Sequence, residues 1–167
     1  KEFRDKAHMA INHFMASTDY TVLAYAIRKD RHLERYGLDA LDPYLLSLRI
    51  VIERAYFAMG RQGKLTIVAE ARNPVLDRLL DIAFLELKIS GTELLKPHDI
   101  AQINPELLIR DKKANIVGLQ MADLIVSPIG RYVIGKPSKE DWVIIAEKLY
   151  HHKGTWNGAG LVILPKD

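Results

Sequence analysis

The chain has 167 residues, a net charge of +3 and a pI near 9.1, with 49% hydrophobic and 27% charged residues. This length predicts one domain that buries about 70% of its unfolded surface, and the composition is that of an ordinary globular protein. The absence of cysteine excludes disulfides and thiolate metal sites. No apolar run approaches the length of a membrane span, and residues 1–6 lack the apolar core of a signal peptide. We therefore expect a cytoplasmic protein, whose mild basicity permits a nucleic-acid partner without requiring one.

Up to residue 62 the pattern predicts a helix, a strand and a second helix. Apolar residues recur at helical spacing over 1–16, and an aromatic and β-branched run at 20–27 predicts a buried strand. Three cations within residues 28–31 are interpreted as a solvated loop, with phosphate contacts as the alternative. Asp42 followed by proline forms a helix start, and helical spacing continues over 43–62.

The rest of the chain continues the alternation of strands and helices. Further strands are expected at 64–69, 107–110 and 161–164, and further helices at 74–90, 117–134 and 139–150. Residues 92–104 are expected to be irregular, because prolines limit regular structure there. Pro128 predicts a kink or break in the helix turn that precedes it. The alternation predicts an α/β or mixed fold with a central sheet.

The most informative stretch is Gly118–Ile125, a strongly apolar helical segment with one carboxylate, Asp123, in its middle. The residues three and four positions away carry no positive charge, so any partner of Asp123 comes from elsewhere in the fold. Asp123 is then either a buried carboxylate held by hydrogen bonds or an arginine, or an active-site carboxylate. We favour the second interpretation.

Glu70 ends the strand at 64–69, and ligands of open α/β sheets bind at such strand ends. Glu70 is either a surface partner of Arg72 or, together with Asp123, part of a two-metal phosphodiesterase site. Mg²⁺ suits carboxylate oxygens, and the cations Arg72, Lys112 and Lys113 suit a phosphate backbone. The sequence carries no Walker-type glycine loop, no G-x-S-x-G elbow and no H-E-x-x-H zinc pair.

Four stretches carry a resemblance to a known family: 68–72, 91–92, 113–124 and 158–165. Through them the chain resembles the domain of unknown function 3800 family, which is placed in the ribonuclease H-like superfamily. The most specific marker is the Gly-Leu-Gln-x-Ala-Asp-Leu run. The resemblance covers nearly the whole chain and implies one ribonuclease H-like domain over 1–167, an α/β fold with a mixed sheet flanked by helices. It also implies that Glu70 and Asp123 are catalytic carboxylates that bind Mg²⁺ or Mn²⁺.

The resemblance fails at the N-terminus. Members of the family open with a strand carrying Asp-Glu-Ser-Gly, whose aspartate is expected to be the first metal ligand, whereas Asp5 lies in a helical pattern. We therefore expect that N-terminal strands are missing by truncation or that the ligand has been lost, and the uncapped start at Lys1 favours truncation.

The expected function is that of a metal-dependent nuclease or phosphodiesterase, inactive or nearly so as this truncated chain. The expected substrate-binding residues are Arg72, Lys112, Lys113 and Gln120. The alternative is a non-catalytic module that binds nucleic acid or protein partners on the same scaffold.

Overall fold

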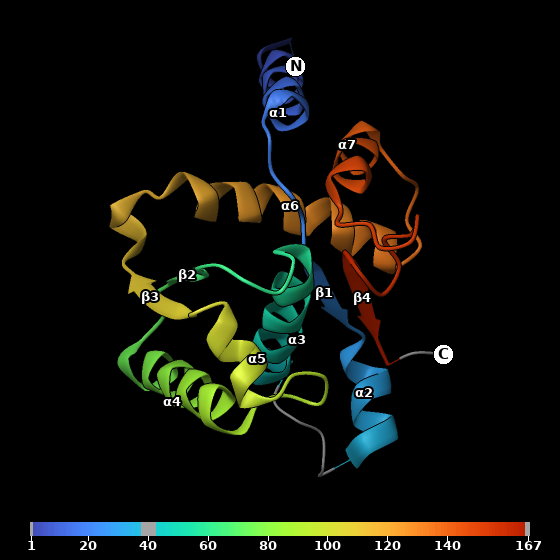
Figure 1. Cartoon of the computed structure of the whole chain (residues 1–167). Helices are drawn as coiled ribbons and strands as arrows, with labels where there is room; N and C mark the ends of the chain where they lie inside the picture. Colours follow the sequence, from blue (N-terminus) through green and yellow to red (C-terminus); the bar gives the residue numbers. More distant parts are fainter. Residues whose placement is uncertain (1, 38–42, 166–167) are drawn as a thin grey trace. The chain divides into compact units, whose positions relative to one another are not determined.

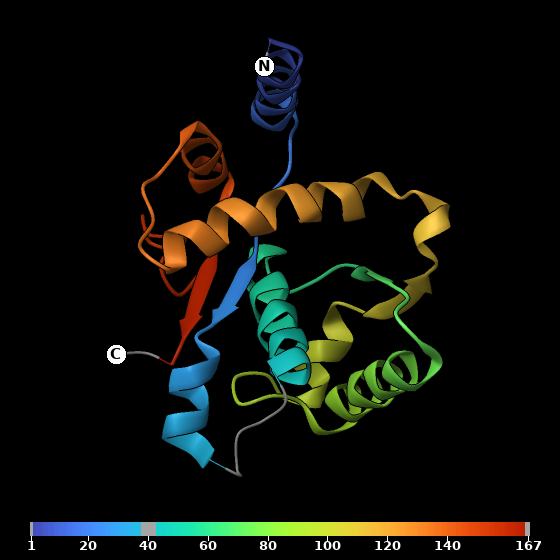
Figure 2. The same cartoon turned by 180° about the vertical axis from the view of Figure 1, so that it is seen from behind.

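A computed structural model describes residues 2–37 and 43–165 (Figures 1 and 2). The elements in chain order are α1 (Glu2–Ser17), β1 (Ala24–Ile27), α2 (Lys29–Tyr36), α3 (Pro43–Ala58), β2 (Thr66–Glu70), α4 (Pro74–Ser90), α5 (Pro97–Gln102), β3 (Glu106–Arg110), the 3-10 helix η2 (Lys112–Ala114), α6 (Val117–Val133), α7 (Glu140–Lys148) and β4 (Leu161–Leu164). The predicted α/β class is therefore confirmed. Two compact units make up the chain: residues 1–26 with 121–163, and residues 27–120 with 164–167.

The second unit is built on the parallel pair β2 and β3, in which Thr66 lies opposite Glu106 and Glu70 opposite Arg110. Side chains alternate between the two faces of a strand. The residues that pack on the core of this unit are Ile67, Ala69, Leu107 and Ile109. Glu70 and Arg110 each follow a core-facing residue directly, so their side chains belong to the opposite face of the strands, turned away from this core.

The core of the second unit comes mainly from α3, α4 and α5. Its buried members are Leu48, Ile52, Tyr56, Leu80, Phe84, Leu87, Leu95, Ile100 and Ile103. In α4 these residues recur three or four positions apart, which places them on one face of the helix. Asp42, the predicted cap of α3, lies outside the described residues.

Both ends of α4 have recognisable caps. The Asn73 side chain accepts hydrogen bonds from the backbone N–H groups of Val75 (3.1 Å) and Leu76 (3.0 Å), which satisfies two of the free donors of the first turn. At the other end Gly91 has a positive φ of 79°, and a Cβ there would lie 2.3 Å from the carbonyl oxygen of Leu95. Gly91 is one of the residues behind the family resemblance, and its structural role is to end this helix.

Tyr56 gives the second unit a testable pH dependence. Tyr56 is buried, and its hydroxyl donates a hydrogen bond to Oδ1 of Asp99 at 3.3 Å. Burial, and then the negative charge of Asp99, raise the pKa of Tyr56 above its usual 10.0. Because the folded-state pKa is the higher one, this contribution to stability is complete below about pH 10 and is lost as the pH rises through the folded-state pKa.

We expect Tyr56→Phe to lose less stability at alkaline pH than the wild type, because phenylalanine has no hydroxyl that ionises. Urea unfolding of the wild type and the variant between about pH 9 and about pH 12 measures it. The difference between the two proteins isolates Tyr56 from the other six tyrosines. An unfolding free energy with the same pH dependence in both proteins would contradict the assignment.

The first unit contains most of β1 and β4, which lie side by side in parallel (Figure 1). The backbone N–H of Ala24 donates to the carbonyl of Gly160 at 2.7 Å. An aromatic group fills the core beside them: Tyr132 and Trp142 stack with ring centroids 4.0 Å apart, and Trp156 meets both rings edge-on. The other buried members of this core are Val22, Ile129, Ile145, Leu149 and Leu161.

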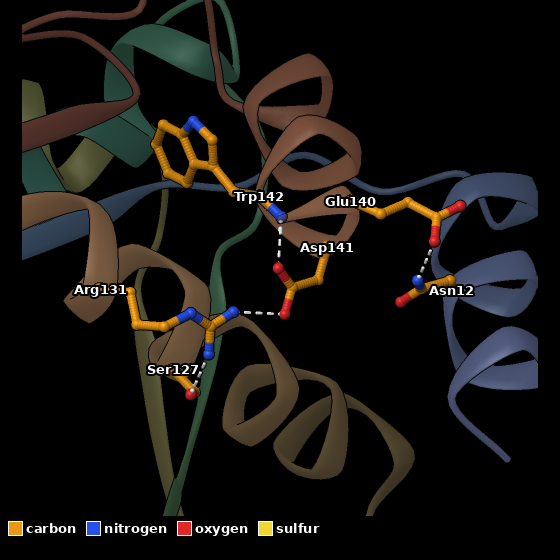
Figure 3. A network of polar contacts seen from close by, with 6 residues as sticks. All are labelled: Asn12, Ser127, Arg131, Glu140, Asp141 and Trp142. Atoms are coloured by element: carbon orange, nitrogen blue, oxygen red, sulfur yellow. Dashed lines mark hydrogen bonds and ion pairs between the residues drawn. The ribbon is translucent and has the colours of Figure 1, made fainter. Parts of the chain in front are cut away.

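Polar contacts fix α7 in the first unit (Figure 3). Arg131 on α6 forms an ion pair with Asp141 on α7 and donates a second hydrogen bond to Ser127 at 2.9 Å. Asp141 also accepts from the backbone N–H of its neighbour Trp142 at 2.8 Å. On the far side of α7, the Glu140 carboxylate accepts a 2.9 Å hydrogen bond from Asn12 of α1. These contacts connect the three helices of this unit.

Two short helices contradict the sequence prediction. Most of the cationic stretch expected to be a loop lies in α2, which begins directly after Arg28, because Lys, Arg, Glu and Leu all favour helices and His32 of this helix is buried. Within the stretch expected to be irregular, α5 begins with Pro97 at its first turn, a position that proline suits. The Asp99 carboxylate accepts from the backbone N–H of Lys96 at 2.9 Å and caps that helix.

Three other predictions change in detail. The strand expected at 20–27 is limited to Ala24–Ile27, because only this part pairs with β4, while Val22 makes an isolated bridge to Leu149. A kink or break was expected before Pro128; the break is absent, since α6 continues through this residue, and the kink stays a prediction. The described residues form two two-stranded sheets, and a ribonuclease H-like sheet stays a prediction, as does the single domain.

Among residues 2–37 and 43–165, no helix combines the length and the hydrophobicity that crossing a bilayer requires.

Candidate functional site

Glu70 lies at the carboxyl end of β2, where the sequence placed it. Its side chain is 40% exposed, and Oε1 lies 3.7 Å from Nζ of Lys112, whose side chain is 80% exposed. An ion pair this exposed contributes little to stability, and its lysine can move away at small cost. The Glu70 carboxylate is therefore accessible to a ligand.

Glu70 pairs with Lys112 and lies opposite Arg110, and further cations follow in sequence on the adjoining loops. We call the residues at this strand end the strand-end cluster, and all of them but Glu70 are exposed: Glu70, Arg72, Arg110, Asp111, Lys112 and Lys113. Four cations and two carboxylates favour an anionic ligand such as a phosphate group. Glu70 is a surface partner of a cation, Lys112, and its expected pairing with Arg72 stays a prediction.

Arg110 is a member of this cluster that was not among the residues expected from the sequence. In the parallel pair Arg110 lies directly opposite Glu70, and the backbone N–H of Ala71 donates to the carbonyl of Arg110 at 2.9 Å. Its position at the end of a predicted strand could have indicated this. The carboxyl ends of parallel strands meet at one edge of a sheet, so the last residues of 64–70 and 107–110 belong together.

The loop after β3 holds its lysines in a defined turn. The Asp111 side chain caps η2 by accepting from the backbone N–H of Lys113 at 2.7 Å. Asn115 ends this turn in the left-handed conformation, and its side chain accepts a hydrogen bond from the amide of Gln120. Gln120, expected to bind substrate, therefore also holds the start of α6 against the lysine-bearing loop.

Asp123 lies on α6, in the helix predicted for it, but its surroundings differ from those expected. Asp123 and its neighbours Ala122 and Leu124 are all exposed, so the interpretation of Asp123 as a buried carboxylate is wrong. An exposed carboxylate needs no buried partner, because water solvates it. Asp123 belongs to the first unit and Glu70 to the second, and the predicted approach of the two carboxylates stays a prediction.

Carboxylates are the only strong metal ligands among the predicted site residues. Oxygen donors of this kind fit Mg²⁺ or Mn²⁺ in chemical type, and the accessible Glu70 carboxylate is suited to such an ion. Within the described part of the chain, no group of three or more His, Asp or Glu side chains is placed to hold an ion together.

A shallow pocket of about 470 Å³ lies at the opposite end of the β2–β3 pair. Lys64 and Glu106, which form an ion pair at 3.3 Å, lie at its edge, and Phe84 and Lys88 of α4 line another side. Because Glu106 begins β3 while Glu70 ends β2, the pocket is separate from the strand-end cluster.

The fold and the strand-end cluster together define a mixed α/β protein with an accessible glutamate among cations at the end of a parallel strand pair. Comparison of the chain with protein-family models, with curated proteins and with solved structures found no match.

Proposed function

We propose that the protein is a metal-dependent nuclease or a related phosphodiesterase of the ribonuclease H-like type. The observation that carries the proposal is the position of Glu70, which is accessible at the carboxyl end of β2 and has four cations in the cluster around it. The Gly-Leu-Gln-x-Ala-Asp-Leu run on α6 supports it from the sequence. The proposal includes a ribonuclease H-like mixed sheet as the scaffold.

In this proposal the carboxylates of Glu70 and Asp123 hold Mg²⁺ or Mn²⁺. The metal would supply Lewis-acid stabilisation of the negative charge that develops on a phosphate oxygen. Arg72, Lys112 and Lys113 contribute charge that attracts and positions the phosphate backbone. Gln120 maintains the turn that presents the two lysines, through its hydrogen bond to Asn115.

The phosphate-binding part of the proposal predicts the effect of Lys112→Met and Lys113→Met. Each variant should weaken binding of single- and double-stranded DNA and RNA, and each should reduce the salt slope of log K by about 1. Fluorescence anisotropy at salt concentrations from about 50 to about 200 mM measures both effects. Lys136→Met, which removes an exposed cation after α6, is the matched control.

Equal salt slopes for the wild type, the two variants and the control would show that the strand-end cluster does not bind nucleic acid. A loss of affinity that is similar for all the nucleic acids, and that occurs in the two variants but not in the control, supports the proposed contacts with phosphate.

The excess of cations in the strand-end cluster also supports a second function, a non-catalytic module that binds nucleic acid or a protein partner. The same binding assay distinguishes the two when it is repeated with and without Mn²⁺. A nuclease of the proposed type gains affinity from Mn²⁺ and loses this gain in Asp123→Asn. A non-catalytic module binds equally with and without the metal.

A further inference from the structure

Helix α4 has a second apolar face besides the one that packs in the core. Leu80, Phe84 and Leu87 are buried, as described above. The helix also carries large apolar side chains that are exposed to between 43% and 75%: Val75 (70%), Leu79 (50%), Ile82 (43%), Leu85 (55%) and Ile89 (75%). We call these five residues the outer stripe of α4. Their spacing of three or four residues returns them to one side of the helix.

In the second unit, α4 packs against α3, α5 and β3, and its ribbon lies along the outside of this unit in both views (Figures 1 and 2). An apolar stripe of this length is unusual on the free surface of a monomer. The stripe is therefore a candidate contact surface, and its sequence indicates which partner would fit it.

The outer stripe has the same spacing when it is read from either end. The steps between its members are four, three, three and four residues, with Ile82 in the centre. A second α4 laid antiparallel about a two-fold axis at Ile82 therefore brings Ile89 to the level of Val75 and Leu85 to the level of Leu79. Ile82 of one copy meets Ile82 of the other. A self-complementary surface of this kind is what an isologous dimer interface needs.

The charges beside the stripe follow the same symmetry. Arg78 and Glu86 each lie four residues from Ile82, on opposite sides of it along the chain. The two-fold axis that matches the apolar residues therefore places Arg78 of each copy at the level of Glu86 of the other copy, which gives two equivalent pairs of opposite charge. A parallel arrangement would put Arg78 level with Arg78 and Glu86 level with Glu86. The charges thus favour the antiparallel pair.

We propose that the outer stripe of α4 is the interface of a homodimer, in which two copies of α4 pack antiparallel across a two-fold axis at Ile82. A helix of 17 residues is about 25 Å long. One such pair is at the small end of specific interfaces, so we expect a dissociation constant on the order of 10 µM. This inference is independent of the proposed nuclease function.

Sedimentation velocity over a range of concentrations tests the dimer. The wild type should change from 19.0 kDa to about twice this mass as the concentration rises through the dissociation constant. Ile82→Asp should raise the dissociation constant by about 100-fold or more, because it places two carboxylates in the apolar centre. Leu94→Asp is the matched control, since Leu94 is 57% exposed but lies outside the stripe. A wild type that stays at 19.0 kDa at every concentration overturns the proposal.

Charge reversal tests the orientation of the pair. Arg78→Glu and Glu86→Arg should each weaken the dimer by about tenfold, and the double variant should restore wild-type affinity. Restoration supports antiparallel pairing; equal dimerisation in all four proteins would place the interface elsewhere and overturn the proposal.

Cross-linking tests the position of the axis without relying on the folding of Ile82→Asp. The chain has no cysteine, so Ile82→Cys introduces a single thiol, and a bismaleimide that spans about 8 Å matches the distance between packed helices. Ile82→Cys should give a covalent dimer, whereas Leu94→Cys should not. No covalent dimer from Ile82→Cys, or equal yields from both variants, counts against the axis.

Discussion

Replacing Gly160 by alanine should destabilise the protein by about 3 kcal/mol or more. A Cβ at this position would lie 2.5 Å from the carbonyl oxygen of Tyr150, 2.6 Å from its backbone nitrogen and 3.1 Å from the carbonyl carbon of Leu149. These are backbone atoms, and hydrogen bonds hold them in place. Val22 donates to the carbonyl of Lys148 at 2.7 Å, and Tyr150 donates to the carbonyl of Val22 at 3.0 Å. The methyl group therefore forces apart segments that form the centre of the first unit.

Two other glycines serve as matched controls for Gly160→Ala. Gly158 has a φ of 72° but open space around its Cβ position, so Gly158→Ala carries only backbone strain, about 1 kcal/mol. Gly130 lies inside α6 with no atom near its Cβ position, so Gly130→Ala should be stabilising by up to about 1 kcal/mol. Urea unfolding followed by far-UV circular dichroism measures all three. Equal unfolding free energies for Gly160→Ala and Gly158→Ala would show that the close approach is not rigid.

Replacing Trp142 by alanine should reduce the free energy of unfolding by about 3–5 kcal/mol. The Trp142 ring is buried and stacks on Tyr132 at an interplanar angle of 8°, with Trp156 against its edge. Removing the ring leaves a cavity between the α6 and α7 side chains and eliminates two aromatic contacts. Trp142→Phe should lose roughly half as much, since a smaller ring still fills part of the space.

Val143→Ala is the control for Trp142→Ala, because Val143 is the next residue of α7 and its side chain is 55% exposed. It should change stability by less than about 1 kcal/mol. Circular dichroism is the suitable signal, since Trp142 is one of only two tryptophans and its loss would change the fluorescence baseline. A loss in Trp142→Ala no larger than that in Val143→Ala would contradict the assigned core.

The long elements could be predicted because local signals and packing agree in them. In α4 an Asn-Pro start, apolar residues at helical spacing and a closing glycine all indicate the same helix, and the structure places it at Pro74–Ser90. The short helices α2 and α5 were missed because polar residues dominate them and their formation depends on a few contacts. For α5 these are the first-turn proline and the Asp99 cap, which the sequence contained but periodicity does not detect.

The candidate site could be predicted in part for the same reason. A strand pattern that ends in glutamate located Glu70, and the structure adds Arg110, which only strand pairing brings beside it. The alternative of a buried Asp123 rested on its apolar neighbours in sequence, which do not establish a buried face. Along α6 the buried residues are Pro128 and Ile129, toward the other end of the helix. Pairing and burial are properties of the whole fold, and a short run of residues does not encode them.

The proposed binding of a metal by Glu70 and Asp123 is measured most directly by the concentration of free Mn²⁺. Electron paramagnetic resonance should be recorded on the wild type, Glu70→Gln, Asp123→Asn, the double variant and the control Glu106→Gln, which changes an exposed carboxylate at the start of β3. We expect weak binding by the wild type and the control, and a loss of about tenfold or more in each site variant. If both carboxylates hold one ion, the double variant should bind no worse than either single variant. Equal free Mn²⁺ in all five proteins would contradict the claim.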